Sequence, residues 1–463
     1  MSKIRGMRGI LASSIGVTCA AALALPLAPP AAAAAAGPAS TAGAATRAAV
    51  TAPSDVPGST QSLPLRPLAH DRATGATVLG LTPRAVRHFS LLGVIWDDPA
   101  AELAGRVQVR TRSAAGGDWS GWRDVETHYT DHGADPGASE AASGQVRGAT
   151  APLWVGESDG VEVRVRPEPE PGEDPGAGDA PELPSGLRLE LIDPGDAAAD
   201  AREGVDGRTG PVTAAAAAAS AANARLAAPG ADEIPELDGE RTQREFLALR
   251  GAELTEEQRA KPHIGPRPAI VTRRGWGADE GLRKGGFVYT SKVKAAFVHH
   301  TASGNNYSCS QAPSLIRGFY RYHVRSLGWR DIGYNFLVDK CGRIYEGRAG
   351  GVAKAVKGAH TLGFNTNTTG IAVIGSYGSK KPSSSAVKAV ARLTAWKLGL
   401  HGMNPRSKTY LTSGGGNLYR KGKKVRLNVI SGHRDGFNTS CPGGKLYKKL
   451  GTVRSTAARY QGR

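Results

Sequence analysis

Two stretches of the chain carry hydrophobic patterns that predict regular structure. Between residues 85 and 193, short runs rich in Val, Ile and Leu favour β-strands at 89–96, 106–112, 161–166 and 187–192. The middle two runs alternate with polar residues at period two, and glycine-containing turn signals separate the runs. This stretch is therefore predicted to be a small β-sandwich, and nothing in it marks a reaction centre or a role.

The second patterned stretch covers residues 263–463. Apolar runs at 295–299, 334–338 and 370–375 predict strands. Residues 311–326 place Leu315, Ile316, Phe319, Tyr320 and His323 on one helical face, and residues 386–398 and 445–458 predict two further helices. Strands interleaved with helices favour an α/β domain with a central mixed β-sheet flanked by helices.

The N-terminal segment, residues 1–36, has the order of a secretory signal peptide. Lys3, Arg5 and Arg8 precede an apolar stretch that ends near Leu27, and small residues follow. Polar residues and prolines interrupt this stretch, which favours a cleaved signal over a permanent membrane helix. No later run reaches the ~20 apolar residues that a membrane span needs. We therefore expect a secreted, extracellular or cell-wall associated protein with no stable membrane span.

The other segments have the composition of connections. Residues 37–84 are rich in Ala, Pro, Ser and Thr and predict a disordered stalk. Residues 194–262 predict a linker that contains a low-complexity alanine run and a short helix around 243–250.

The charge is divided unevenly along the 463 residues. Residues 1–260 contain 23 Lys and Arg against 35 Asp and Glu, whereas residues 261–463 contain 36 against 6, which gives net charges of −12 and +30. So basic a region should attract a polyanion. The export signal and the absence of a nucleic-acid motif argue against nucleic acid as the partner. The basic clusters at 421–426 and 445–449 fit either anionic cell-wall polymers or a solvated surface.

Four tryptophans of the predicted sandwich also have two interpretations. Trp96, Trp119, Trp122 and Trp154 would form a platform on which sugars stack, or they would pack the core. Core packing is favoured because a small sandwich needs such bulk.

Candidate metal ligands lie at three places in the second stretch. His299 and His300 end an expected strand, and Cys441 follows His433 by eight residues. Two imidazoles and a thiolate suit Zn²⁺ and leave the fourth tetrahedral position for water, as in catalytic sites. Taken alone, the histidine pair fits a structural role and Cys441 fits a disulfide equally well. A hydrolytic triad of Ser431, His433 and Asp435 is disfavoured, since residues two apart rarely converge.

Four motifs, in this order, carry a family resemblance: FVHHTAS, GWRDIGYNFLVDKCGRIYEGRAGG, KGAHTLGFNTNTTGIAVIGSY and ISGHRDGFNTSCPG. Together with TRRGWGA at 272–278, they resemble the peptidoglycan recognition proteins and the type 2 N-acetylmuramoyl-L-alanine amidases. The resemblance covers about residues 267–450. It implies a monomeric zinc amidase that binds peptidoglycan and hydrolyses the amide between the lactyl group of N-acetylmuramic acid and L-alanine, by attack of zinc-activated water.

The resemblance also implies roles for individual residues. Its zinc ligands fall on His299, His433 and Cys441, whereas strand alternation turns His300 to the other side. Its catalytic positions fall on Tyr334 and Thr439. Four more residues match positions at or near the peptidoglycan groove: His323, Trp329, His360 and Asn365. For His323 and Trp329, which lie beside an amphipathic helix, core packing is the alternative. One branch of the family lacks the zinc cysteine and only binds peptidoglycan, so a non-catalytic binding or wall-anchoring module is the alternative; the retained ligand positions favour an enzyme.

The cysteines allow one further expectation. Cys19 lies in the signal peptide and Cys441 is a candidate ligand, which leaves Cys309 and Cys341, 32 residues apart. An exported domain would oxidise them if their Cα atoms come within about 7 Å. A disulfide is therefore expected, although the family usually closes one between nearer cysteines. Two free buried thiols are the alternative.

Overall fold

The structure is a computed structural model that describes residues 58–70, 77–127, 129–168, 181–195 and 213–463. All of these residues belong to one unit, residues 55–463. The expected signal peptide, residues 1–36, lies outside the described residues, as does most of the expected stalk. Within the described ranges, no helix combines the length and the hydropathy needed to cross a bilayer.

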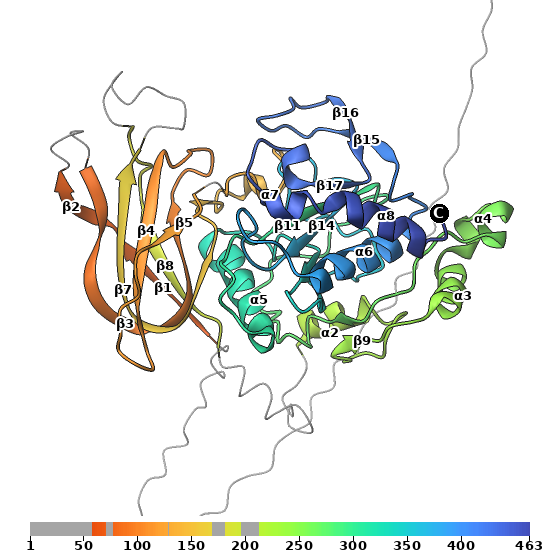
Figure 1. The fold of residues 1–463 in the computed structure, drawn as a ribbon, viewed down its shortest axis with the longest axis horizontal. Coiled ribbons are helices and arrows are strands. Elements are labelled where there is room, and N and C mark those ends of the chain that lie inside the picture. The colour runs from red at the N-terminus through yellow and green to blue at the C-terminus, as the bar shows by residue number, and fades with distance from the viewer. Residues whose placement is uncertain (1–57, 71–76, 128, 169–180, 196–212) are drawn as a thin grey trace, which may run out of the picture. The chain divides into compact units, whose positions relative to one another are not determined.

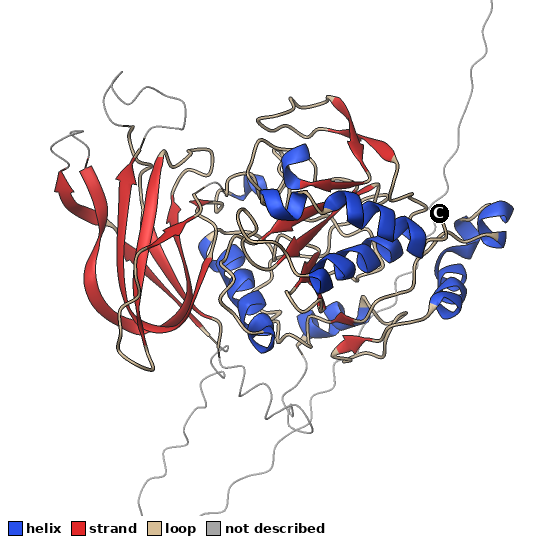
Figure 2. Ribbon diagram, viewed as in Figure 1, coloured by secondary structure: helices blue, strands red, loops and turns tan. Residues whose placement is uncertain are grey.

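The N-terminal part of the described chain is a β domain (Figures 1 and 2). Its strands are β1 (Ser59–Pro64), β2 (Arg66–His70), β3 (Thr77–Trp96), β4 (Gly105–Ser113), β5 (Arg123–Val125), β6 (Gly148–Ala149), β7 (Leu153–Pro167) and β8 (Arg188–Asp193). They form one hydrogen-bonded network in the order β1-β8-β3-β7-β4-β5, and β2 and β6 both pair with β3. Register shifts interrupt the pairing of β3 with β7, and β3 curves strongly (Figure 1). The curved strands enclose a core of alternating inward-facing aliphatic residues.

The four predicted strands of this domain are confirmed, but the stalk prediction is wrong for part of its range. Residues 59–70 and 77–84 form β1, β2 and the start of β3. β1 pairs along its whole length with β8, so its backbone hydrogen bonds rather than a hydrophobic pattern place it. All five residues of β2 are exposed, so no buried face gives this strand a hydrophobic pattern that distinguishes it from a stalk.

The C-terminal part is an α/β domain. Its strands are β9 (Glu233–Ile234), β10 (Ile270–Val271), β11 (Ala295–His300), β12 (Phe336–Val338), β13 (Ile344–Glu346), β14 (Thr368–Val373) and β17 (Ile430–Gly432), with a separate hairpin of β15 (Lys408–Thr412) and β16 (Lys424–Asn428). The main sheet has the order β17-β11-β14-β12-β13-β10-β9. The pairs around β11 and β14 are parallel and the β12–β13 pair is antiparallel, so the expected mixed sheet is confirmed.

Helices cover both faces of this sheet. They are α2 (Ala214–Ala221), α3 (Gly239–Arg250), α4 (Glu256–Ala260), α5 (Ala312–Arg321), α6 (Ser384–Gly399), α7 (Gly444–Tyr447) and α8 (Leu450–Tyr460). Val298, Val338 and Val373 share a hydrophobic cluster with α6 and α8. Leu337 and Ala372, which alternate with them, cluster with α5 instead. The period-two pattern of the strands therefore assigns each helix to a face.

The expected linker, residues 194–262, contains regular structure within its described part, residues 213–262. β9 is an edge strand of the main sheet, and Ile234 and Phe246 belong to its core. Helix α3 begins earlier than predicted because the Asp238 side chain accepts a hydrogen bond from Arg241 N and caps the helix at residue 239.

Two predicted helices are divided in the structure. The range 311–326 contains α5 and then a π-helical turn, η4 (Tyr322–Ser326). The range 445–458 contains α7 and α8, separated near Lys449. Hydrophobic periodicity continues across both breaks, so it could not reveal the change in backbone hydrogen bonding. The π-helical turn carries His323, one of the residues predicted to lie at or near the groove.

Candidate metal centre

Two adjacent parallel strands bring His299 and His433 together. β11 pairs with β17 such that Val298 lies opposite Gly432. The residues that follow them, His299 and His433, therefore lie at the same edge of the sheet. Cys441 returns to this edge because the loop that follows His433 folds back on itself, with Arg434 N donating to Cys441 O at 3.1 Å. The three side chains predicted as ligands therefore meet, and all three are buried.

A fourth side chain, His132 of the β domain, joins these three. One ligand atom from each of His132, His299, His433 and Cys441 lies within 4.8 Å of the others. Cys441 Sγ is 3.9 Å from His299 Nδ1. The imidazole centroids of His132 and His433 are 4.6 Å apart, and those of His299 and His433 are 4.5 Å apart. The sequence did not predict His132, because a histidine in a loop more than 150 residues before the other donors gives no spacing signal.

His300 lies outside this group, as strand alternation predicted. Its Nδ1 accepts a hydrogen bond from Tyr377 N at 3.2 Å, on the opposite face of β11. The disfavoured triad is not formed either: Ser431 Oγ donates to Asn428 O, and Asp435 accepts from Gly432 N and Tyr447 Oη.

Two nitrogen atoms of the cluster have no hydrogen-bond partner, although both are buried: Nε2 of His132 and Nδ1 of His433. The opposite nitrogen of each ring is engaged. His132 Nδ1 is 2.6 Å from Asp131 Oδ1, and His433 Nε2 is 3.2 Å from the Asp131 carbonyl oxygen. On His299, Nε2 contacts His360 Nδ1 at 3.2 Å, so its Nδ1 is the atom that faces Cys441.

Burial sets the protonation of these donors. It lowers the pKa of His299 well below its ordinary value and that of His433 to about 3, so both rings are neutral and have a lone pair to donate. Burial likewise raises the pKa of the Cys441 thiol well above its ordinary value. A cation bound here would reverse that effect and release the thiol proton. The pKa of Asp131 lies below its ordinary range. Burial raises this pKa, but the nearby rings of His132 and His433 together lower it by a larger amount.

The donor set fits a zinc ion. Buried nitrogen atoms without a partner are costly unless something binds them, and three imidazoles with one thiolate are ligands that Zn²⁺ prefers. The contacts of the rings to His360 and Asp131 resemble those that fix metal-binding histidines in other proteins. His299, His433, Cys441 and His132 would hold the ion.

The two predicted catalytic residues lie close to this cluster. The Tyr334 ring is 5.5 Å from that of His299 and 5.7 Å from that of His132, and its hydroxyl is 3.3 Å from Tyr129 Oη. Tyr334 precedes β12 instead of lying within it. Its carbonyl oxygen accepts from Arg348 N and that of Asn335 accepts from Gly347 N, so the loop that follows β13 holds this segment. Thr439 is half-buried, and its Oγ1 accepts from Cys441 N at 3.2 Å.

The four predicted groove residues divide into two groups. His360 is completely buried behind His299, in space that Gly370 leaves free, because a Cβ there would lie 2.3 Å from His360 Cγ. Its contacts are those of a residue that orients a ligand rather than of a groove residue. His323, Trp329 and Asn365 instead contact the β-domain segment that carries His132.

The remaining aromatic and cysteine predictions have clear outcomes. Cys309 and Cys341 form the expected disulfide, with Cα atoms 6.2 Å apart, and Cys441 is the free cysteine among the described residues. Trp96 and Trp154 are core residues, as favoured. Trp119 and Trp122 are half-buried and stack with the guanidinium groups of Arg110 and Arg164.

Comparison with known proteins identifies both parts of the chain. The family model for N-acetylmuramoyl-L-alanine amidase matches residues 289–444, and the model described as Rv3811 N-terminal galactose-binding domain-like matches residues 44–185. Peptidoglycan-recognition protein 1 of Holotrichia diomphalia is 32% identical over 184 residues, which are 40% of this chain and 79% of that protein. Peptidoglycan-recognition protein SC2 of Drosophila simulans is 29% identical over 185 residues, 40% of this chain and 85% of that protein.

Among solved structures, Drosophila PGRP-LB is 25% identical, with a TM-score of 0.32, over 40% of this chain and 92% of that one. The family assignment rests on the sequence matches and not on this score. An amidase family model matches its α/β domain, and a relative of 32% identity is matched over about four-fifths of its own length. The chain therefore belongs to the peptidoglycan recognition protein and type 2 amidase family.

Proposed function

We propose that this protein is a secreted, zinc-dependent N-acetylmuramoyl-L-alanine amidase, which hydrolyses the bond between the lactyl group of N-acetylmuramic acid and L-alanine. The observation that carries the proposal is the convergence of His299, His433 and Cys441, with their ligand atoms within 4.8 Å of one another and a nitrogen of His433 that has no hydrogen-bond partner. The type 2 amidases that the sequence resembles place their zinc ligands at these positions.

The chemistry needs an electrophile and a nucleophile. Zinc, when bound, supplies both functions, because it polarises a carbonyl and lowers the pKa of bound water. The protein supplies the geometry: His360 holds the His299 ring through Nε2, so that Nδ1 faces the other donors.

Tyr334 is placed to stabilise the charge that develops on the amide oxygen. Burial raises the pKa of its hydroxyl well above the ordinary value, so the group keeps its proton and can donate a hydrogen bond. Thr439 fixes the Cys441 backbone through its hydroxyl, which places this residue beside the sulfur ligand.

His323 offers a second donor at the same edge. Its Nδ1 accepts from Gly333 N at 3.2 Å, so the ring proton lies on Nε2, and burial keeps the ring neutral by lowering its pKa. Nε2 therefore donates toward the groove, where its present acceptor is Tyr129 Oη at 2.7 Å. A polar atom of the substrate would take the place of this hydroxyl.

Export is supported by two observations. The disulfide between Cys309 and Cys341 is stable in oxidising compartments, and the first 36 residues have the order of a signal peptide. Peptidoglycan, and the anionic polymers attached to it, would also suit the net charge of +30 on residues 261–463.

A binding module without catalysis is the second candidate. The relatives are named for peptidoglycan recognition, and a fourth donor, His132, would take the position that a water molecule needs if it bound the ion. The two candidates differ in whether peptide is released from the glycan.

The test combines metal analysis with product analysis. The purified chain and its His132→Ala variant are assayed for zinc, then incubated with peptidoglycan, and the soluble products are identified by mass spectrometry. We expect one zinc per chain and, from the variant at least, peptides with free L-alanine N-termini that disappear after chelation and return with zinc. New reducing sugar ends would indicate a glycosidase. Peptidoglycan binding with no release by either protein would favour the binding module.

A further inference from the structure

The segment that carries His132 lies in the candidate active site. This segment, residues 129–147, is called the insert here; it connects β5 to β6 of the β domain. It contains three acidic residues, Asp131, Asp135 and Glu140, and all three are buried against the α/β domain. Because residues 261–463 carry a net charge of +30, the contact joins an acidic segment to a basic domain.

The first contact is at the metal donors. His132 is 7% exposed, and its partnerless Nε2 belongs to the cluster formed with His299, His433 and Cys441. Asp131 orients two rings at once, His132 through its carboxylate and His433 through its carbonyl oxygen. The turn is closed by Gly133 at φ +123°, a conformation that L-residues rarely adopt.

The second contact is at the residues expected to bind substrate. The Tyr129 hydroxyl contacts His323 Nε2 at 2.7 Å and Tyr334 Oη at 3.3 Å, and its ring stacks on Trp329. Burial raises the Tyr129 pKa far above its ordinary value, so this hydroxyl is neutral. One side chain of the insert therefore covers the predicted catalytic tyrosine and two of the predicted groove residues, His323 and Trp329.

The third contact is a carboxylate site. Asp135 Oδ1 accepts hydrogen bonds from Gly363 N and Asn365 N, both at 3.1 Å, and from Asn365 Nδ2 at 2.8 Å. Its other oxygen lies 3.2 Å from Lys357 Nζ. Two backbone donors, one amide and one ammonium group thus surround an acid that belongs to another domain.

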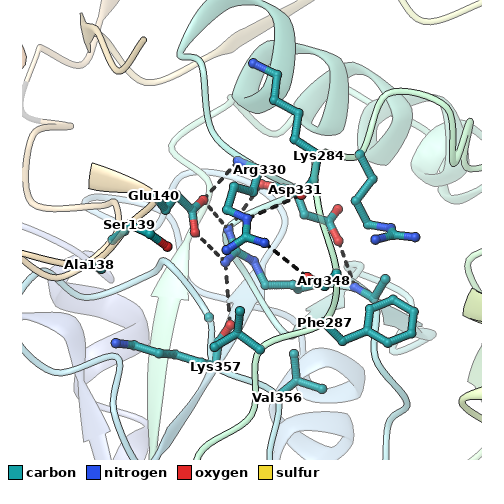
Figure 3. A pocket seen from close by; sticks show the side chains of 16 residues that line it. Ala138, Ser139, Glu140, Lys284, Phe287, Arg330, Asp331, Arg348, Val356 and Lys357 are labelled. Atoms are coloured by element: carbon teal, nitrogen blue, oxygen red, sulfur yellow. Dashed lines mark hydrogen bonds and ion pairs between the residues drawn. The ribbon is translucent and has the colours of Figure 1, made fainter. Parts of the chain in front are cut away.

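The fourth contact borders a pocket of about 210 Å³. Glu140 forms two hydrogen bonds with the Arg348 guanidinium, at 2.8 and 2.9 Å, and a third with Arg330 N at 3.0 Å. Figure 3 shows its carboxylate pointing at these groups across the pocket, with Lys284 and Lys357 also on the wall. Burial raises the pKa of Glu140, but the groups around it, Arg348 first, together lower it by a larger amount. The pKa therefore lies below its ordinary value, and the acid is ionised.

We infer that the insert keeps the enzyme latent, with His132 as the fourth zinc ligand. Three imidazoles and one thiolate complete a tetrahedral zinc site, which is the closed arrangement of structural zinc and leaves no position for water. Tyr129, Asp135 and Glu140 occupy the hydrogen-bond donors and cations that an anionic peptidoglycan stem would use. The insert and the substrate therefore compete for one surface, and catalysis requires that the insert leave. This inference rests on the proposed function.

The ligand count is tested without any activity measurement. Zinc X-ray absorption on the full chain should count three imidazoles and one sulfur, and His132→Ala should reduce the count to two imidazoles with one added light-atom ligand. His70→Ala is the matched control, since it removes an exposed histidine of the same domain. A count of two imidazoles in the unmodified protein would overturn the inference.

Latency is tested by the rate of peptide release. His132→Ala should release peptide about tenfold faster or more than the unmodified chain, because the competent fraction of molecules rises. His70→Ala should match the unmodified chain. Equal rates for the unmodified chain and His132→Ala would overturn latency.

A cross-link provides a variant that does not depend on losing His132. A Cβ built at Gly414 lies 3.4 Å from Asp135 Cβ, close to the spacing of about 3.5–4.5 Å that a disulfide needs. The double variant Asp135→Cys, Gly414→Cys should be inactive when oxidised and regain activity on reduction, whereas reduction should leave the unmodified chain unchanged. Full activity of the oxidised form would contradict a closed insert.

The two proposals fail differently. If X-ray absorption counts three imidazoles and no variant releases peptide, including His132→Ala, then His132 is retained as the fourth ligand and the amidase proposal is rejected. Full release by the unmodified chain with two imidazoles would retain the amidase and reject latency.

Discussion

Two buried polar clusters, the metal cluster that both domains form and a second one within the α/β domain, differ in whether their atoms have hydrogen-bond partners. The metal cluster contains partnerless nitrogens on His132 and His433. In the second cluster, Arg273 donates to both carboxylate oxygens of Glu280, at 2.6 and 3.2 Å, and to Asp331 Oδ1 at 3.0 Å. Both clusters are inaccessible to solvent. Partnerless nitrogens that converge with other donor atoms mark the first cluster as a candidate ligand site, whereas the paired charges of the second mark it as structure.

The comparison also explains a sequence motif. Arg273 and Trp276 belong to TRRGWGA, the segment at 272–278 that resembles the start of the family's domain. The Arg273 guanidinium lies over the Trp276 ring, and Trp276 Nε1 donates to Glu346 O at 2.7 Å. The motif therefore holds the domain together and takes no part in the metal site.

The largest effect is expected for Cys441→Ser. Replacing the thiolate by a hydroxyl removes the soft ligand, so zinc content should fall below one per chain and peptide release should fall by about a thousandfold or more. The measurements are metal analysis and the release assay in the His132→Ala background. Cys309→Ser with Cys341→Ser is the matched control, because it removes two cysteines that do not contact the cluster. Stoichiometric zinc in Cys441→Ser would break the comparison.

The next effect is expected for Arg273→Met. Removing the guanidinium takes away the cation that two buried carboxylates share, and only Glu280 keeps another one, Arg283, so the free energy of unfolding should fall by about 3–5 kcal/mol. Zinc content of the folded protein should not change. Denaturant unfolding and metal analysis check the two parts. Arg274→Met, a neighbouring exposed arginine, should change stability by about 0.5 kcal/mol or less. Zinc loss in folded Arg273→Met would show that the clusters are not independent.

A smaller effect is expected for His360→Gln. This variant removes the ring that orients His299, so zinc affinity should fall about 10–100-fold while the donors themselves stay. Competition with a chromogenic chelator measures the affinity. His401→Gln serves as the control, since it replaces another buried histidine away from the donors. An unchanged affinity in His360→Gln would mean that His299 needs no such support.

The smallest effect concerns pH and the acid next to the arginine cluster. Burial raises the pKa of Glu346 to about 7, although Asn223 and Arg273 N donate hydrogen bonds to it. Between its ordinary value of 4.5 and 7, the native state binds more protons than the unfolded state, so this residue makes stability fall as pH rises.

The measurement is the difference in free energy of unfolding between the unmodified chain and Glu346→Gln, both without metal. The buried histidines, whose pKa values are lowered, give the opposite slope in both proteins and cancel. Relative to the variant, the unmodified chain should lose about 1 kcal/mol from pH 5 to pH 6. Lys397, whose pKa burial lowers to about 7, contributes only above that range. A constant difference would contradict the raised pKa.

The outcome of the sequence predictions follows the range of the interactions. Period-two and helical patterns identified β11, β14 and α6 because burial on one face is a local property of the sequence. The same patterns missed β1 and β2, whose positions depend on hydrogen bonds to β8 and β3. Nor could these patterns show that His360 packs against Gly370 and contacts His299.

By itself, the sequence determined the family of the α/β domain, the three candidate donors on β11 and in the loop after β17, and the cysteines left over for a disulfide. Each depends on residue identity within a short segment, which a motif records. Only the tertiary structure decided that His132 faces those donors. His132 lies in a tight turn of the other domain, and this turn is held in place by contacts between residues more than 200 positions apart in the sequence. Long-range packing of this kind leaves no periodicity or motif spacing that the sequence alone could reveal.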